Sequence, residues 1–546
     1  MKKSFTTFLV CLLLIIFLSP VITTSKTGLS DKKSESTLRA PIGFLDNQKN
    51  AVSNVEFYTS NYGIFGLNYT YNKGGLFWPR NSGNQYLYAA GFWFGAQKFL
   101  PGETFPRKLV EVSYNPNNGK SWFIPGRIED GDLSNQTDSN TYRAYFSSDF
   151  RKYSGVPFDV TDGPNWPLWI NPDDLLSTGL YLGGYEPDIS KRNKDNYPFG
   201  PAFVSGEDIF STYKDTDLEQ FDGGPGLREP LGYPLRLQVE QTIYTWGNDL
   251  LKDVVIIYYN IINFSQDTLY DCWFAPVYDV DIGKIPSPEA ENDYTKLYND
   301  DRTLNLVIAW SDTMTYEGDK EPDGIIGFSY LMTPSVDSNN FLRKDKKIFL
   351  VTEQLGIKTY KNWPIDEDYC GDIDRYAVLS SCTIDTIEGN GDMRLFFSTG
   401  PFNMLPGDSS KIALSIMFTT QDSIIGFQKF TTSKPDFTKI VELARYTQNF
   451  FYNNMVLGID DEKKYDDDNL NIYPNPAVDL FNILSENSDI IEQIEIFNVL
   501  GEKIFVQNDI LTSEYKLNTR NLQNGSYYIR IKSGNSTDTK LLQIAK

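Results

Sequence analysis

The segment 235–262, LRLQVEQTIYTWGNDLLKDVVIIYYNII, carries two patterns that are typical of a β-sheet protein. From Leu235 to Ile243, apolar residues alternate with polar ones, which is the period-two pattern of a half-buried strand. Residues 254–262 are almost entirely apolar, as expected for a central strand that is covered on both faces. The segment therefore predicts neighbouring strands in a sheet with a buried core.

Further strand patterns occur after this segment up to residue 420, and no helical pattern separates them. We expect strands at 269–280, 304–310, 325–332, 348–352, 394–398 and 412–418. Such a series predicts a β-sandwich. A helix is expected from Pro435 to about Asn454, because apolar residues recur there at spacings of three and four. Residues 231–457 are therefore interpreted as a β-sandwich domain that ends in a helix.

The region before this domain is rich in aromatic residues and in turn formers. Residues 86–95 read YLYAAGFWFG, and we interpret 41–230 as an N-terminal β region with tight hairpins. At the start of the chain, Lys2 and Lys3 precede an apolar run at 8–18 that is too short to span a bilayer. Residues 1–25 therefore read as a signal peptide, and residues 26–40 as a polar leader.

The chain closes with an acidic linker at 458–468 and a small module at 469–546. In this module Pro474 and Pro476 forbid a helix. Residues 494–506 carry short apolar segments on either side of a turn at Gly501. Asn524 and Gly525 form a dipeptide typical of hairpin turns, and a period-two strand pattern comes after it. The module is predicted to be a small Ig-like antiparallel β-sandwich.

Four blocks of this module resemble the type A C-terminal sorting domain of Bacteroidetes type IX secretion cargo. They are NIYPNP (471–476), IEIFNVLGEKIF (494–505), LQNGSYYIRI (522–531) and KLLQIAK (540–546). The resemblance implies that the motif residues are Tyr473, Pro474, Asn475, Pro476, Gly501 and Gly525. It further implies passage across the outer membrane by the secretion machinery, removal of the domain by a sortase-like peptidase, and attachment to surface lipopolysaccharide. The cargo region itself is similar to uncharacterised secreted proteins of the same bacteria.

Composition excludes several kinds of chemistry. The formal net charge is −22, which argues against nucleic acid as a partner because such binding needs a basic surface. The chain has no histidine, so Ser-His-Asp and Cys-His catalysis and histidine zinc sites are excluded. Carboxylate chemistry, tyrosine or lysine chemistry, and oxygen-ligated metals are left. Because Asp and Glu together number 72, the sequence cannot single out a catalytic pair.

The best local candidate for a metal site is a structural calcium site at Asp279 and Asp281, with Asp300 and Asp301 further along the chain. Calcium takes about six to eight oxygen ligands in flexible geometry, and two aspartates two residues apart on a strand project to one side. The stretch is not an EF-hand loop, since Lys284 replaces the required glycine. The alternative interpretation is a set of solvated turn aspartates.

The cysteines allow one disulfide in an oxidising compartment, between Cys370 and Cys382. Cys272 lies in an apolar run and is expected to be a small buried side chain. Together these features predict an exported surface or secreted protein with a binding or structural role. The alternative is a secreted carboxylate-dependent enzyme acting on carbohydrate, or a carbohydrate-binding protein. We favour a role without catalysis, and glycans are among the expected partners.

Overall fold

The structure is a computed structural model. It describes residues 45–128, 142–149, 166–169, 184–185, 189–192, 203–220, 225–247, 251–284, 293–311, 324–345, 349–386, 389–420, 435–456, 470–473, 477–485, 490–498, 503–533 and 536–544. The predicted signal peptide (1–25), polar leader (26–40) and acidic linker (458–468) lie outside the described residues.

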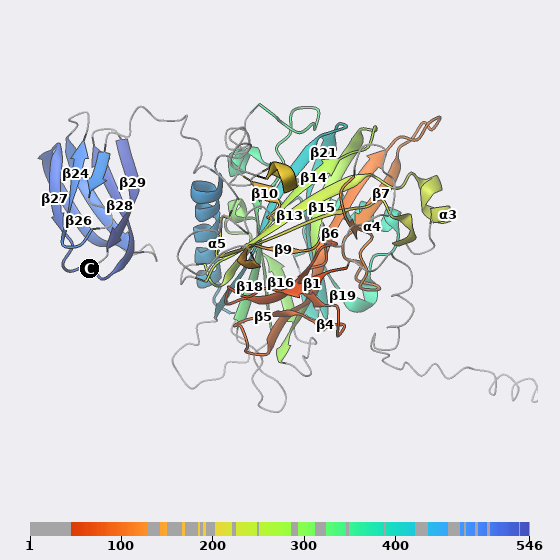
Figure 1. Ribbon diagram of the computed structural model, residues 1–546, viewed down its shortest axis with the longest axis horizontal. Helices are drawn as coiled ribbons and strands as arrows, with labels where there is room; N and C mark the ends of the chain where they lie inside the picture. The colour runs from red at the N-terminus through yellow and green to blue at the C-terminus, as the bar shows by residue number, and fades with distance from the viewer. Residues whose placement is uncertain are drawn as a thin grey trace, which may run out of the picture.

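Two large antiparallel sheets form the cargo part of the described chain (Figure 1). The first sheet has eight strands in the order β1 (Asn47–Lys49), β2 (Glu56–Ser60), β5 (Leu76–Phe77), β6 (Asn84–Lys98), β15 (Leu269–Lys284), β21 (Met393–Met404) and β19 (Thr359–Pro364), with β7 (Arg107–Val112) also paired to β6. The second sheet has ten strands in the order β20 (Gly389–Gly391), β16 (Asp293–Leu297), β17 (Leu306–Ser311), β18 (Gly324–Met332), β22 (Ser409–Thr420), β14 (Val254–Asn263), β13 (Leu237–Thr245), β12 (Glu207–Lys214) and β8 (Ile124–Pro125), with β9 (Tyr145–Phe146) also paired to β12. Two short hairpins complete the set: β3 (Leu67–Asn68) with β4 (Lys73–Gly74), and β10 (Leu168–Trp169) with β11 (Gly184–Tyr185).

Each of the two sheets combines strands from early and late parts of the chain. In the first sheet β6 pairs along its length with β15, and in the second β12 pairs with β13. Residue 230, which separates the two regions defined from the sequence, lies between β12 and β13. That boundary therefore falls within one folded unit, because both sheets need strands from either side of it.

The sheets pack face to face over an aromatic core, which confirms the predicted β-sandwich. Phe92 on β6 lies with its ring centroid 5.4 Å from that of Tyr259 on β14. Tyr278 on β15 stacks on Phe328 of β18 at 4.0 Å. Both pairs join the first sheet to the second. Aromatic pairs at these distances add to the stabilisation that comes from burial alone.

The observed strands match the sequence patterns closely in the second half of the cargo. β14 begins at Val254 and β15 begins at Leu269, as expected, although β15 runs on to Lys284. The strand expected at 348–352 is wrong over its described part, where residues 351–353 form a 3-10 turn. The backbone N–H of Leu350 donates to the Glu353 carboxylate at 3.0 Å, and Leu350 is 69% exposed. A local hydrogen bond of this kind competes with strand pairing.

Helix α5 (Thr438–Phe450) confirms the expected C-terminal helix of the cargo. It starts slightly later than Pro435 and continues as a π-helical turn, Phe451–Val456. Its buried face, with Ile440 and Ala444, packs on the outer face of the second sheet. A Cβ on Gly327 of β18 would lie 2.9 Å from Ile440 Cγ1, so the glycine permits the close approach.

Two further helices, which the sequence patterns did not predict, lie beside the first sheet. They are α3 (Pro225–Arg228) and α4 (Asp372–Leu379). In α4, Tyr376 donates from its hydroxyl to the carbonyl of Asp271 on β15 at 2.8 Å. The remaining helical turns are of the 3-10 type: Ser147–Asp149, Ile189–Lys191, Leu218–Gln220, Glu229–Leu231, Arg302–Leu304, Val351–Glu353 and Ile365–Glu367.

The C-terminal module is a separate small sandwich, as predicted. Its three-stranded sheet has the order β23 (Leu470–Tyr473), β24 (Leu480–Ser485), β27 (Glu514–Asn518), and its four-stranded sheet has the order β26 (Lys503–Thr512), β25 (Ile491–Asn498), β28 (Gly525–Ser533), β29 (Ser536–Ile544). Ile483 from one sheet and Ile529 from the other share one core. Asn524 and Gly525 do not close a hairpin between neighbouring strands, because β27 and β28 belong to different sheets.

Candidate functional site

A row of side chains from three neighbouring strands crosses the outer face of the first sheet. Asp279 on β15 stands opposite Arg394 on β21, which in turn stands opposite Trp363 on β19. Since Tyr278 points to the second sheet and packs on Phe328, its neighbour Asp279 faces the other way. The sheet register thus brings a carboxylate, a guanidinium and an indole together.

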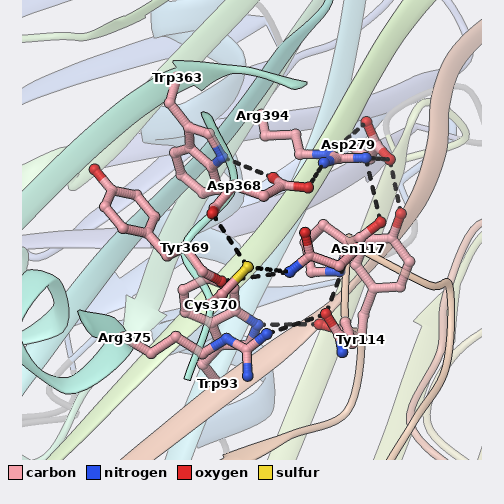
Figure 2. Close-up of polar contacts among 12 residues, drawn as sticks. Trp93, Tyr114, Asn117, Asp279, Trp363, Asp368, Tyr369, Cys370, Arg375 and Arg394 are labelled. Atoms are coloured by element: carbon pink, nitrogen blue, oxygen red, sulfur yellow. Dashed lines mark hydrogen bonds and ion pairs between the residues drawn. The ribbon is translucent and has the colours of Figure 1, made fainter. Parts of the chain in front are cut away.

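Two chain segments cover this row. The first contains Tyr114 and Asn117, and the second runs from Asp368 into α4 (Figure 2). Tyr114 donates from its hydroxyl to Asp279 Oδ2 at 2.7 Å. Under this cover Asp279 is 5% exposed and Arg394 is 4% exposed. We refer to Tyr114, Asp279, Trp363, Asp368 and Arg394 as the Arg394 network.

Arg394 joins the two carboxylates of this network (Figure 2). Its Nε lies 3.4 Å from Asp279 Oδ1, and its Nη1 donates to Asp368 Oδ2. Its Nη2 also donates to the carbonyl of Pro116 at 3.3 Å. Burial raises the pKa of Asp279, and the charge of Arg394 opposes that increase. The pairing therefore opposes the protonation of Asp279 that burial favours.

The Asp368 side of the network includes a thiol. Trp363 Nε1 donates to Asp368 Oδ1 at 2.9 Å, and the Cys370 thiol donates to the Asp368 carbonyl at 3.5 Å. Asn117 Nδ2 donates to Cys370 Sγ at 3.4 Å. These bonds tie the start of α4 to the segment around Asn117. Both carboxylates of the Arg394 network already have hydrogen-bond or ion-pair partners. The network is therefore suited to a structural role, in which it holds the covering segments on the sheet.

A half-buried carboxyl, Asp392, lies beside the Arg394 network. Burial, together with the negative charge of Asp279, raises the pKa of Asp392 to about 6, while Arg394 acts in the opposite direction. A carboxyl with such a pKa exchanges its proton near neutral pH.

We expect the substitution Tyr114→Phe to lower the free energy of unfolding by about 1–3 kcal/mol, because it removes the hydroxyl donor from a buried carboxylate. Chemical denaturation with urea would measure the loss. Tyr71→Phe is the matched control, since Tyr71 is 70% exposed and should tolerate the change. Equal stability of the two variants would contradict a stabilising role for the Tyr114 hydroxyl.

The structure does not gather the four aspartates of the predicted calcium site. Asp279 is engaged by Arg394, and Asp281 Oδ2 accepts a hydrogen bond from Gln85 Nε2 at 2.6 Å. Asp301 caps the 3-10 turn at Arg302–Leu304 by accepting from the Thr303 backbone N–H at 3.2 Å. Asp300 is exposed.

Among the described residues, no group of three or more His, Cys, Asp or Glu side chains is arranged to hold a metal ion. The calcium site stays a prediction from the sequence.

The cysteines are also placed by the structure. Cys370 and Cys382 are both free and exposed, so the disulfide that the sequence allows between them is not formed in this structure. The two residues lie at opposite ends of the α4 segment, and Cys370 interacts with Asn117 and Asp368 instead. Cys272 is fully buried, which confirms the expectation of a small apolar side chain.

A groove of about 590 Å³ opens where the end of β16 meets the start of α5. Its lining is largely polar and includes Asp300, Asp385, Asp436, Glu442, Thr386 and Thr438. Arg445 also lines it and pairs with Asp301 at 3.4 Å, and Lys296 Nζ lies 4.4 Å from the Phe437 ring centroid. The groove therefore combines carboxylates, hydroxyls and an aromatic ring on one open surface.

Sequence reasoning missed the charged residues that lie within buried strands. Arg394 stands in the stretch MRLFF (393–397), and Glu111 stands in LVEV (109–112). Charged residues are almost never fully buried unless they are paired. A charge inside an otherwise apolar strand was thus the available signal for the Arg394 network, although the partner of each charge is set by the fold.

The residues of the sorting motif are described only in part. Tyr473 ends β23, and Gly525 begins β28 with a φ of 151°. Pro474, Asn475, Pro476 and Gly501 lie outside the described residues. A separate finding concerns membranes: in the part of the chain that the structure describes, no helix has the length and apolar character needed to cross one.

Comparisons with known proteins address the C-terminal module most directly. Residues 471–545 match the family model described as the secretion system C-terminal sorting domain. A search of the curated proteins finds no match. Among solved structures the chain is similar to a polysaccharide lyase, with 8% identity and a TM-score of 0.20, over 92% of this chain and 47% of that one.

The chain spans about half the length of that lyase, and a likeness at this TM-score carries no argument about fold or activity. The sorting match agrees with the small sandwich at 470–544 and with the four sequence blocks that resemble it. Residues 471–545 are therefore a type IX secretion C-terminal sorting domain, which indicates that the protein is exported to the cell surface or secreted.

Proposed function

We propose that the exported chain is a ligand-binding component of the cell surface and that the groove beside α5 is its ligand site. The observation that carries this proposal is the open, polar groove at the junction of β16 and α5. Carboxylates and hydroxyls such as those of Asp300, Glu442 and Thr386 accept hydrogen bonds from polyhydroxylated ligands. Binding pockets commonly combine such groups with an aromatic wall, here Phe437. The chemistry favours a glycan as the ligand.

The alternative is a carboxylate-dependent enzyme acting on carbohydrate. It requires two carboxyl groups about 5–10 Å apart on either side of a substrate bond. Two close carboxyls in the described residues, Glu111 and Asp215, are each 0% exposed, so no substrate reaches them. Asp279 is held by Arg394. These observations exclude these three carboxyls, so the enzyme alternative would have to use the carboxylates that line the groove.

The proposal also includes two steps after export. Cleavage within residues 458–468 would release the cargo from its sorting domain, and attachment to lipopolysaccharide would then keep the cargo at the surface. Both steps rest on the resemblance of the sorting domain to its family.

A glycan-array screen of the purified protein, with calcium and with a chelator, tests the proposal. We expect selective binding that the double variant Asp300→Asn with Glu442→Gln reduces at least about tenfold, because each side chain loses its charge as an acceptor. Glu229→Gln is the control, since Glu229 is exposed and lies outside the groove.

A blank array would favour a purely structural or protein-adhesion role. Binding that both variants retain would place the ligand site elsewhere on the cargo. Either result would leave the export assignment intact, since that assignment depends on a different domain.

A further inference from the structure

Two acidic side chains meet between the sheets at the edge of the cargo sandwich. Glu111 is on β7 of the first sheet, and Asp215 comes directly after β12 of the second. Both residues are 0% exposed. They are far apart in the chain, so only the packing of one sheet on the other brings them together.

The hydrogen bonds around this pair leave acceptors without donors. Asp215 Oδ1 accepts from the Leu237 backbone N–H at 2.8 Å. Asp215 Oδ2 and both oxygens of Glu111 receive no donor from another described residue. The two carboxyls are, however, within hydrogen-bonding reach of each other. Two carboxylates accept only, so a hydrogen bond between them requires one proton.

The charged neighbours act on the pair in opposite directions. The charge of Arg228 of α3 lowers the pKa of Glu111, whereas the charge of Asp372 of α4, which is paired with Arg228 at 3.1 Å, raises it. Arg375 of α4 interacts with Asp372 and Tyr233, and the Tyr233 hydroxyl is bonded to the backbone of Val110. Beside Asp215 in the chain, the buried and charged residues are Lys214 and Asp217. Leaving two like charges together in this setting would be costly.

We propose that Glu111 and Asp215 share one proton in the folded protein, and that this proton is part of the contact between the two sheets. At alkaline pH the proton is lost, and the contact between the two sheets at β7 and β12 becomes weaker. This inference does not depend on the ligand or on the groove.

Electrostatics support the geometry. Burial raises the pKa of Glu111 well above its usual range, and the charge of Asp215 raises it further. Burial also raises the pKa of Asp215, to about 7, while its bonds to Glu111 and to the Leu237 N–H oppose the increase. In the unfolded chain both carboxyls lose their protons near about pH 4. The folded state therefore binds more protons than the unfolded state from about pH 4 upward. Stability falls as pH rises through the window from about pH 4 to about pH 7, and it falls further above that window until Glu111 also loses its proton.

The substitution Glu111→Gln tests the proposal, because the amide donates to Asp215 without needing a shared proton. Melting temperatures of the full-length chain should be measured across this window and above it. We expect the wild-type melting temperature to fall by about 5 °C more than that of E111Q between about pH 5 and about pH 8. Asp215→Asn should behave in the same way, since its side-chain oxygen still accepts from the Leu237 N–H.

Glu103→Gln is the matched control. Glu103 lies before β7 in the chain, is partly exposed and pairs with Arg107, the first residue of β7. Its variant should therefore keep the wild-type pH dependence. The wild-type protein also offers an independent readout. Near neutral pH, its infrared spectrum should contain the carbonyl band of protonated carboxyl groups, and the band should be weaker in E111Q, where Asp293 and other buried carboxyls still contribute to it.

Parallel pH profiles for the wild type and for both pair variants would overturn the proposal, and so would an infrared band of equal intensity in the wild type and in E111Q. A divalent cation is the other species that could join the two carboxyl groups. If added calcium raises the melting temperature of the wild type but not of E111Q, a cation and not a proton joins the two carboxylates, and the proposal is wrong.

Discussion

Replacing Arg394 with methionine should lower the free energy of unfolding of the cargo by about 3–5 kcal/mol, because the change leaves buried carboxylates without their counter-ion. Asp279 is 5% exposed, so water does not take the place of the guanidinium. Asp368 keeps its bond from Trp363, whereas Asp279 keeps only the Tyr114 hydroxyl. Methionine fills a similar volume, so the loss measures charge pairing more than packing.

A surface ion pair supplies the matched control for this variant. Arg107 pairs with Glu103 near the turn between β6 and β7, and both side chains are partly exposed. Exposed pairs contribute little to stability because water and salt screen them. Arg107→Met should therefore leave the unfolding curve in urea unchanged within error.

The double variant Arg394→Met with Asp279→Asn distinguishes charge pairing from other effects. If unpaired charge is the cause, neutralising Asp279 recovers part of the stability lost in the single variant, and the two changes are non-additive. Strict additivity, or a loss no greater than that of Arg107→Met, would show that Arg394 does not stabilise the sheet through its carboxylate partners.

Sequence patterns predicted the strands of the sandwich because local periodicity reflects burial. β14 is buried along most of its length and reads as an apolar run. β13 lies where its alternating sequence predicts a strand, although its polar residues Gln238 and Gln241 are buried as well because both of its faces are covered. Helix α5 was found for the same reason, since one face packs on the second sheet and the other meets solvent. Such features depend on neighbours in the chain, which a single sequence displays.

Pairings between distant parts of the chain were not predictable in this way. Nothing in residues 84–98 indicates that this strand lies beside residues 269–284, and the boundary drawn at 230 was a consequence of that missing information. The Arg394 network depends on the same long-range register, as does the pair formed by Glu111 and Asp215. For these sites the sequence reveals a charged residue in an apolar strand but does not identify the residue that pairs with it.

The C-terminal module, in contrast, could be identified from the sequence. Its blocks were identified from the order and spacing of short motifs, and the family match at 471–545 confirms them. The turn at Asn524 and Gly525 shows the limit of that approach, because a dipeptide with hairpin chemistry connects strands of two different sheets.

A single buried charge in the C-terminal module should abolish export of the protein. Ile529 on β28 is fully buried in the core shared by the two small sheets. A domain of about 75 residues has little stability to lose, and an unpaired buried carboxylate costs several kcal/mol, so Ile529→Asp is expected to unfold it. In the bacterium that exports the protein, the variant should be missing from the cell surface and the medium and should accumulate in the periplasm. A chain that ends at residue 468 should do the same.

The cargo sandwich should remain folded in this variant, because among the described residues its core clusters share no side chain with the core of the sorting domain. Lys516→Asp on β27 is the matched control, since it introduces the same carboxylate at an exposed position of the same domain. It should be exported normally. Normal export of Ile529→Asp would mean that the machinery recognises the sorting blocks as linear sequence. If instead Ile529→Asp is retained and Lys516→Asp is exported, the folded sandwich is the signal, and the buried core around Ile529 constrains export together with the motif residues.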